Sequence, residues 1–257
     1  FDEECGCKLS LVDEVKKKRE FSKLPDSVVE RAVGIAGDDV KEVRALLRKY
    51  FGVFLTNRVL KGKDDLLGHH MSSKKRDYEK FYGEIFSQEG MAPEYMRNIS
   101  SVVDLGAGVN GFSYEYLKDA IGPVKYVAVE AAGQEVDHMN NYFEENDFNA
   151  EAFCLDLFDV EKIKDVLKKQ GRDRVVFLFQ VVDALENLEK DFSKKFLLDI
   201  SKECEWIVLS LPTESLGGRK KFAVQRKWIM DFLMEEFLIE KEFPMFGERI
   251  IILKNKK

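Results

Sequence analysis

The sequence contains no run of about 18 consecutive apolar residues, the length that a transmembrane helix needs. Histidine and cysteine are also scarce, with three and four residues respectively. His69 and His70 are adjacent and therefore do not share a helix face. Cys5 and Cys7 form a single C-x-C without a second pair, which is weak support for metal binding. We expect neither a membrane span nor a metal site.

The other two cysteines, Cys154 and Cys204, fall in apolar, strand-like contexts and are predicted to be buried free thiols. The cysteine content does not require an oxidising compartment, and no apolar signal peptide opens the sequence. A cytoplasmic location is therefore expected.

Acidic residues outnumber basic ones, and the net charge of −6 does not by itself indicate a nucleic-acid partner. The charges are unevenly distributed, however. Residues 8–80 hold 18 Lys and Arg against 12 Asp and Glu, whereas residues 81–257 hold 23 against 32. A basic first part beside an acidic remainder is compatible with a nucleic-acid surface and equally with solvated helix faces.

Hydrophobic spacing divides the 257 residues into three parts. Residues 9–60 have the pattern of three short helices, a bundle too small to bury much surface alone. We predict a helical N-terminal domain over residues 1–66, a connecting helical segment over 67–100 and an α/β domain over 101–257. In the last part, strands are expected near residues 101–105, 125–130, 150–155, 175–179, 206–211, 237–243 and 249–253. The short connection between the last two predicts an antiparallel pair at a sheet edge.

A glycine-rich turn follows the first expected strand. Gly106, Gly108 and Gly111 have the spacing G-x-G-x-x-G, which lets a turn close tightly and a ligand approach the backbone. The spacing alone is weak, because several kinds of nucleotide-binding fold share it. Asp104 is more informative, since a dinucleotide fingerprint usually has an apolar residue there. An acid at this position suits a cationic ligand such as S-adenosylmethionine.

Two further acids follow the next expected strands. Glu130 lies about twenty residues beyond the glycine turn, where an acid accepts both ribose hydroxyls. Asp156 is placed to bind the exocyclic amine of adenine, with Leu157 and Phe158 available to pack on the ring. Ligands bind at this carboxyl edge in open α/β sheets. The third acid favours a methyltransferase over a nicotinamide oxidoreductase.

The segment after the fifth expected strand reads Ser-Leu-Pro-Thr-Glu-Ser-Leu-Gly-Gly-Arg over residues 210–219. Its glycines permit close approach, and Arg219 could hold a phosphate, although a surface turn explains the pattern equally well. The run resembles the Ser-Phe-Pro-Thr-Arg-Ser-Leu-Gly-Gly-Arg signature of the aminoglycoside-resistance 16S ribosomal RNA guanine-N7 methyltransferases. Residues 70–76, His-Met-Ser-Ser-Lys-Lys-Arg, resemble that family's His-x-Ser-Thr-Lys-Glu-Arg segment, and residues 23–28 resemble its N-terminal helical domain.

The resemblance implies an α/β fold, a Rossmann-like S-adenosylmethionine-dependent methyltransferase core with a seven-stranded mixed sheet behind an N-terminal RNA-docking domain. It implies a monomer that acts on 16S rRNA in the 30S subunit. The implied cofactor-binding residues are Asp104, Gly106, Ala107, Gly108, Glu130, Asp156, Leu157 and Gln180. The implied RNA-binding residues are Lys74, Lys75, Arg76, Ser210, Pro212, Ser215, Gly217, Gly218 and Arg219.

The chain departs from the family pattern at three places. Ser100 and Ser101 stand where the family often has an arginine that pairs with the cofactor carboxylate, Gln180 replaces a lysine, and Glu214 replaces an arginine. We therefore expect another cation or a backbone group to hold the carboxylate.

No catalytic acid or base is expected. Guanine N7 carries a lone pair and no proton, so methyl transfer to it relies on positioning and electrostatics. Two alternatives remain open: a catalytically weakened RNA-binding homologue, and a small-molecule methyltransferase whose N-terminal helices form a lid.

Overall fold

The computed structural model describes residues 11–51, 67, 73–87, 98–171, 173–213 and 226–256. Its centre is a seven-stranded sheet with the strand order β3-β2-β1-β4-β5-β7-β6. The strands are β1 Ser101–Leu105, β2 Lys125–Glu130, β3 Ala150–Cys154, β4 Arg174–Phe179, β5 Trp206–Pro212, β6 Phe237–Met245 and β7 Glu248–Asn255.

The first five strands run parallel, and the last two form the antiparallel pair that the short connection predicts. β7 inserts between β5 and β6, so β6 lies at the edge of the sheet. The strand order reverses at β1, which pairs with β2 on one side and β4 on the other. Such a switch point leaves a crevice at the carboxyl ends of the strands.

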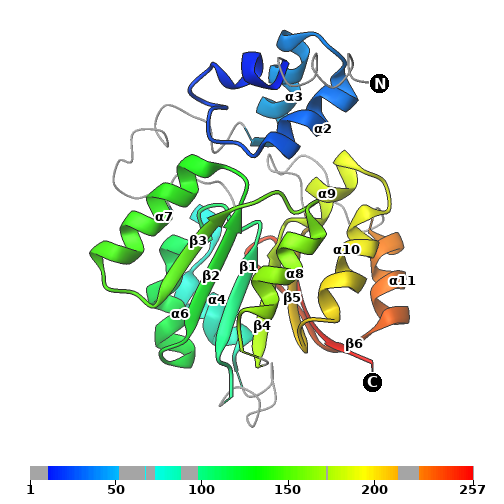
Figure 1. Ribbon diagram of the computed structural model, residues 1–257. Helices are drawn as coiled ribbons and strands as arrows, with labels where there is room; N and C mark the ends of the chain where they lie inside the picture. The colour runs from blue at the N-terminus through cyan, green and yellow to red at the C-terminus, as the bar shows by residue number, and fades with distance from the viewer. Residues whose placement is uncertain are drawn as a thin grey trace.

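Helices cover both faces of the sheet (Figure 1). One face packs against α4 Tyr78–Ile85, α6 Tyr114–Ile121 and α7 Gly133–Glu145. The other packs against α8 Val160–Lys168, α9 Val182–Leu188, α10 Phe192–Ser201 and α11 Lys227–Glu236. The parallel strands are therefore buried on both sides, which explains their near-continuous apolar sequences. None of the described helices is long and apolar enough to cross a membrane.

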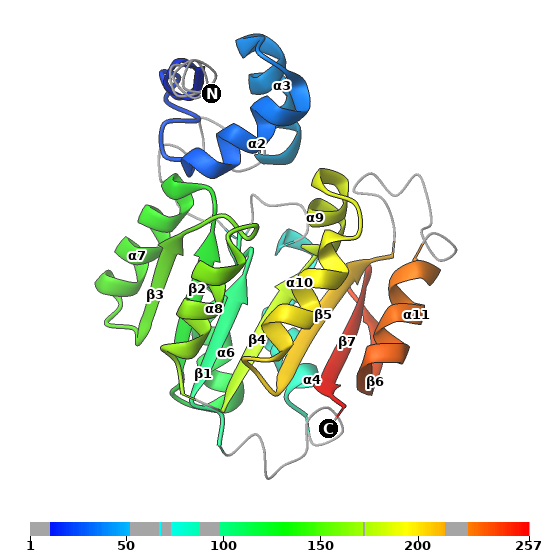
Figure 2. The same cartoon turned by 45° about the vertical axis from the view of Figure 1, so that its right-hand side comes forward.

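The N-terminal helices form a separate small cluster. Residues 11–16 are helical, followed by α2 Asp26–Ala36 and α3 Val40–Phe51. Their apolar sides, including Val29, Val43 and Leu47, make a core of their own. This N-terminal unit lies over the carboxyl ends of the parallel strands (Figures 1 and 2).

Three details differ from the sequence-based expectations. Cys154 is exposed, because it ends the edge strand β3, whereas Cys204 is buried as expected. The short helix α9 has no counterpart among the expected elements. The hydrophobic spacing of residues 222–236 predicts one long amphipathic helix; the structure describes it from Lys227, and residues 222–225 lie outside the described residues.

Candidate functional site

A cavity of about 330 Å³ lies between the N-terminal unit and the carboxyl edge of the sheet. From the sheet it is lined by the glycine turn, Glu130, residues 156–158 and residues 179–181. Residues 49–51 at the end of α3 line it from the other side. The cavity therefore sits at the topological switch point, where ligands bind in this class of sheet.

The glycine turn has the backbone geometry that its sequence predicts. Gly106 and Gly108 have φ of 75° and 53°, in the left-handed region that favours glycine. A Cβ atom on Gly106 would lie 2.6 Å from Cγ2 of Val181. A side chain there would therefore both strain the turn and collide with the cavity wall.

Glu130 is buried beside this turn, at the end of β2. Its Oε2 accepts a hydrogen bond from the Gly108 N–H at 2.9 Å, and its Oε1 accepts one from the Ala132 N–H at 2.9 Å. Burial raises the pKa of Glu130, and the two N–H donors oppose that effect. The carboxylate is thus fixed in the cavity wall, and each oxygen retains a further lone pair for a hydroxyl donor.

Asp156 is 4% exposed at the opposite side of the turn. Its Oδ1 accepts a hydrogen bond from the Phe158 N–H at 3.0 Å, but its Oδ2 has no hydrogen-bond partner among the described residues. The ring of Phe158 is enclosed, with the Arg31 guanidinium 3.7 Å from its centroid and Phe192 stacked at 4.0 Å. Leu157 thus offers the freer apolar surface at this end of the cavity.

Asp104 lies behind the cavity and is not among its lining residues. It is fully buried, and its Oδ2 accepts hydrogen bonds from Asn110 Nδ2 at 2.6 Å and from the Tyr126 hydroxyl at 2.8 Å. Burial raises its pKa to about 6. Asp104 therefore braces the glycine turn through Asn110, and the structure does not bring it to the cavity as a direct ligand contact.

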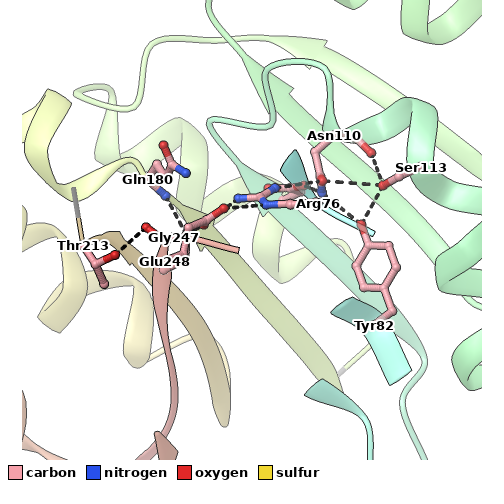
Figure 3. Close-up of polar contacts among 10 residues, drawn as sticks. Arg76, Tyr82, Asn110, Ser113, Gln180, Thr213, Gly247 and Glu248 are labelled. Atoms are coloured by element: carbon pink, nitrogen blue, oxygen red, sulfur yellow. Dashed lines mark hydrogen bonds and ion pairs between the residues drawn. The ribbon is translucent and has the colours of Figure 1, made fainter. Parts of the chain in front are cut away.

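Arg76 is paired with Glu248 in the interior, beside the cavity (Figure 3). The Nε and Nη2 groups of Arg76 each donate to one carboxylate oxygen at 2.8 Å, and the two side chains are 4% and 2% exposed. Nη1 lies 3.4 Å from Asn110 Oδ1. Burial acts to lower the pKa of Arg76, but Glu248 outweighs burial and the pKa is raised. The guanidinium is therefore a permanent cation in the cavity wall.

The family resemblance groups Lys74, Lys75 and Arg76 as RNA-binding residues, but the structure separates them. The two lysines are exposed on the 3-10 helix η3 Ser73–Lys75, whereas Arg76 turns inward to Glu248. The family resemblance also relates the position of Ser100 and Ser101 to the cofactor carboxylate, and the structure does not place these two residues at the cavity. They precede and begin β1 at its amino end, away from the cavity, so their departure from the family pattern does not affect its wall.

Gln180 follows β4 and lines the cavity with a φ of 60°, uncommon for a residue with a side chain. Its N–H donates to the carbonyl and hydroxyl oxygens of Ser210, both at 3.1 Å. The Ser210 hydroxyl in turn donates to Glu248 Oε2 at 2.6 Å. Ser210 is thus a buried support, and its neighbour Pro212 ends β5. Glu214, Ser215, Gly217, Gly218 and Arg219 lie outside the described residues.

Several cations of the N-terminal unit are already paired within it. Lys16 pairs with Asp26, and Arg48 pairs with Glu20. Arg44 donates to the backbone carbonyl groups of residues 14 and 15. In the part of the chain that the structure describes, no group of three or more His, Cys, Asp or Glu is placed to hold a metal ion.

The fold resembles solved methyltransferase structures. The 16S rRNA methylase RmtB has a TM-score of 0.72 and 17% identity, covering 97% of this chain and 98% of its own. An rRNA methylase from Escherichia coli has a TM-score of 0.71 and 16% identity, covering 97% and 100%. The 16S rRNA methyltransferase RmtF, in complex with S-adenosyl-L-homocysteine, has a TM-score of 0.70 and 16% identity, covering 97% and 98%.

No protein-family model matches the chain, and no curated protein matches it in sequence. At such low identities the structural similarity establishes the fold, which is the Rossmann-like methyltransferase fold with a seven-stranded mixed sheet. The resemblance inferred from the sequence is confirmed at that level, because the similar structures include 16S rRNA methylases.

Proposed function

We propose that this protein is an S-adenosylmethionine-dependent rRNA methyltransferase that modifies guanine N7 in the 16S rRNA of the small ribosomal subunit. The observation that carries the proposal is the cavity at the switch point. It combines a positive-φ glycine turn, the anchored carboxylate of Glu130 and the Oδ2 of Asp156, which accepts no hydrogen bond from the described residues. These groups match the donors of an adenosine, namely the ribose hydroxyls and the exocyclic amine.

The cavity also offers a partner for the methionine end. The cofactor carboxylate needs a cation, and Arg76 is a buried one in the wall, held in place by Glu248. Arg76 thereby supplies the cation that the sequence analysis expected to replace the missing arginine before β1. Gly106, Ala107, Gly108 and Gln180 complete the wall at this end, while Asp104 supports the turn from behind.

The proposed chemistry requires little from the protein beyond positioning. When bound, S-adenosylmethionine supplies an electrophilic methyl group on its sulfonium. The atom that accepts the methyl group, guanine N7, has a free lone pair and carries no proton. No side chain therefore has to remove a proton. The chain's own residues hold the adenosine and the carboxylate and close the site with residues 49–51.

RNA recognition is assigned to the N-terminal domain, to two exposed lysines and to the segment that follows β5. The N-terminal helical domain of residues 1–66 would dock on RNA, joined by the segment 67–100 to the methyltransferase domain of residues 101–257. Lys74 and Lys75 are exposed beside the buried Arg76 and would bind phosphates. The segment from Ser210 through Pro212, Ser215, Gly217 and Gly218 to Arg219 would flank the target base. The 16S rRNA methylases RmtB and RmtF, which share the fold, support this substrate.

The test is to incubate the protein with labelled S-adenosylmethionine and 30S subunits and to map the labelled nucleotide. Transfer to a guanine of 16S rRNA is expected, with N7-methylguanine detected by strand scission with aniline after borohydride reduction. Binding to 30S subunits without transfer would instead indicate a catalytically weakened homologue. Turnover of a small molecule without any RNA would contradict the proposed substrate.

A further inference from the structure

Arg31 extends from α2 of the N-terminal unit to Asp156 and Phe158, two residues that line the cavity. Its Nη2 lies 3.7 Å from Asp156 Oδ2, and its Nη1 lies 3.6 Å from Glu189 Oε2. The flat guanidinium lies over the Phe158 ring, whose centroid is 3.7 Å from Cζ. Stacking on Phe158, itself packed on Phe192, fixes the plane of the guanidinium at this position.

The contact between Arg31 and Asp156 contains polar atoms that lack hydrogen-bond partners among the described residues. The two ion-pair distances exceed the 2.7–3.2 Å of an N–H···O hydrogen bond. Arg31 Nε and Asp156 Oδ2 are both buried and lack a hydrogen-bond partner in the described part of the chain. A buried donor group thus lies beside a buried acceptor, and neither is satisfied by the protein. Unsatisfied buried groups are costly, so a ligand that pairs with both would be bound selectively.

Adenine has one edge with this complementary pattern. Its N6 amine is a donor and its adjacent N7 is an acceptor, as on the edge that proteins read in the major groove of DNA. Asp156 Oδ2 accepts only, and the guanidinium donates only. Because Arg31 carries five N–H donors, it can donate to N7 and still remain beside both carboxylates.

We propose that Arg31 is an adenine-recognition residue that donates a hydrogen bond to N7 of the cofactor while Asp156 accepts one from N6. This inference rests on the proposed function, since it assigns the cofactor's adenine to the Asp156 end of the cavity. It makes the N-terminal unit a part of the cofactor site, in addition to its proposed contact with RNA. Cofactor binding then holds this unit on the methyltransferase core.

The experiment compares two probes that differ in one atom. S-adenosylhomocysteine and its 7-deaza analogue, in which C–H replaces N7, are titrated into the full-length protein by calorimetry. The wild type is expected to bind the 7-deaza analogue on the order of 10-fold more weakly, the effect of losing one hydrogen bond from a charged donor. Arg31→Met should bind S-adenosylhomocysteine about 10-fold more weakly than the wild type and should no longer distinguish the two probes.

Arg48→Met is the matched control. Arg48 lies in the same N-terminal unit, but the carboxylate that it pairs with, Glu20, and the ring that it covers at 5.3 Å, Phe21, both belong to that unit and not to the cavity wall. This variant should keep both the affinity and the preference of the wild type. If Arg31→Met fails to fold, Arg31→Lys, which keeps the charge without the planar fork, should still reduce the preference.

The outcomes separate the two proposals. Equal binding of both probes by the wild type would overturn the role of Arg31 and leave the proposed function intact. A preference that persists in Arg31→Met, or that is undiminished in Arg31→Lys, would also overturn it, because another group would then read N7. Failure of the wild type to bind S-adenosylhomocysteine at all would refute the proposed function itself.

Discussion

The buried pair between Arg76 and Glu248 allows stability and ligand binding to be tested separately. Replacing either residue by methionine leaves the opposite charge buried without its partner, since both side chains are at most 4% exposed. Breaking such a pair typically costs about 3–5 kcal/mol. For a protein of this size, that loss corresponds to a fall in Tm of roughly 6–20 °C.

The double variant Arg76→Met/Glu248→Met should recover much of that loss. It removes both charges together, and well-packed apolar replacements of a buried pair are often nearly neutral. Urea denaturation of the wild type, both single variants and the double variant gives the coupling free energy. We expect the double variant to be destabilised by clearly less than the sum of the single variants, because the two side chains share two hydrogen bonds of 2.8 Å.

Calorimetry on the same four proteins tests the proposed role in cofactor binding. The double variant should fold yet bind S-adenosylhomocysteine weakly, because it lacks the cation proposed for the carboxylate. Additive single-variant effects would show that the pair does not form in solution. Wild-type affinity in the double variant would refute Arg76 as the partner of the carboxylate.

Three further predictions follow from the site. Glu130→Gln should weaken S-adenosylhomocysteine binding by about 1–3 kcal/mol, measured by calorimetry, because the amide cannot accept from both backbone N–H groups and the ribose hydroxyls. Reversing Lys74 and Lys75 to Glu should reduce methylation of 30S subunits, most strongly at low salt where the lost phosphate contacts count most, without changing affinity for S-adenosylhomocysteine. Asp104 has a folded-state pKa raised to about 6, so the stability from its neutral form is lost as pH rises from about 4 to 6. The Tm of Asp104→Asn relative to the wild type should therefore increase across this pH window.

The lysine reversal has a matched control, and the Asp104 prediction has a result that would contradict it. The reversal Lys168→Glu, at the end of α8 distant from the cavity, should leave methylation of 30S subunits unchanged. Equal loss of methylation in both reversals would contradict a specific role for Lys74 and Lys75. A Tm difference between Asp104→Asn and the wild type that is constant from pH 4 to 6 would contradict the raised pKa of Asp104.

The elements that local sequence patterns specify were predictable. The parallel strands and the glycine turn follow from apolar runs and glycine spacing, and the structure contains both. The face of the sheet on which Asp104 lies could also have been predicted from the sequence. Successive residues of a strand point to opposite faces, so Asp104 shares the face of Val102, which packs into the core with α4 and α6.

Contacts between distant segments were not predictable in this way. Lys74, Lys75 and Arg76 form a uniform basic run, and no local signal separates the arginine whose partner lies 172 residues away. Arg31 lies on a predicted helix, but its contact with Asp156 depends on how the N-terminal unit docks on the sheet. Phe158 is apolar in either case, and only the folded chain shows that Arg31 and Phe192 enclose its ring.

The position of Glu248 also has a consequence for the order in which the protein matures on the ribosome that makes it. β7 is the last of the seven sheet strands to be synthesised, yet it occupies an interior place between β5 and β6. Until Glu248 emerges, Arg76 and Ser210 lack the carboxylate that joins them. A nascent chain can therefore assemble β1 to β5 with their helices, but its cavity wall remains unfinished until β7 takes its place between β5 and β6. Cofactor binding would then begin only after β7 has been inserted.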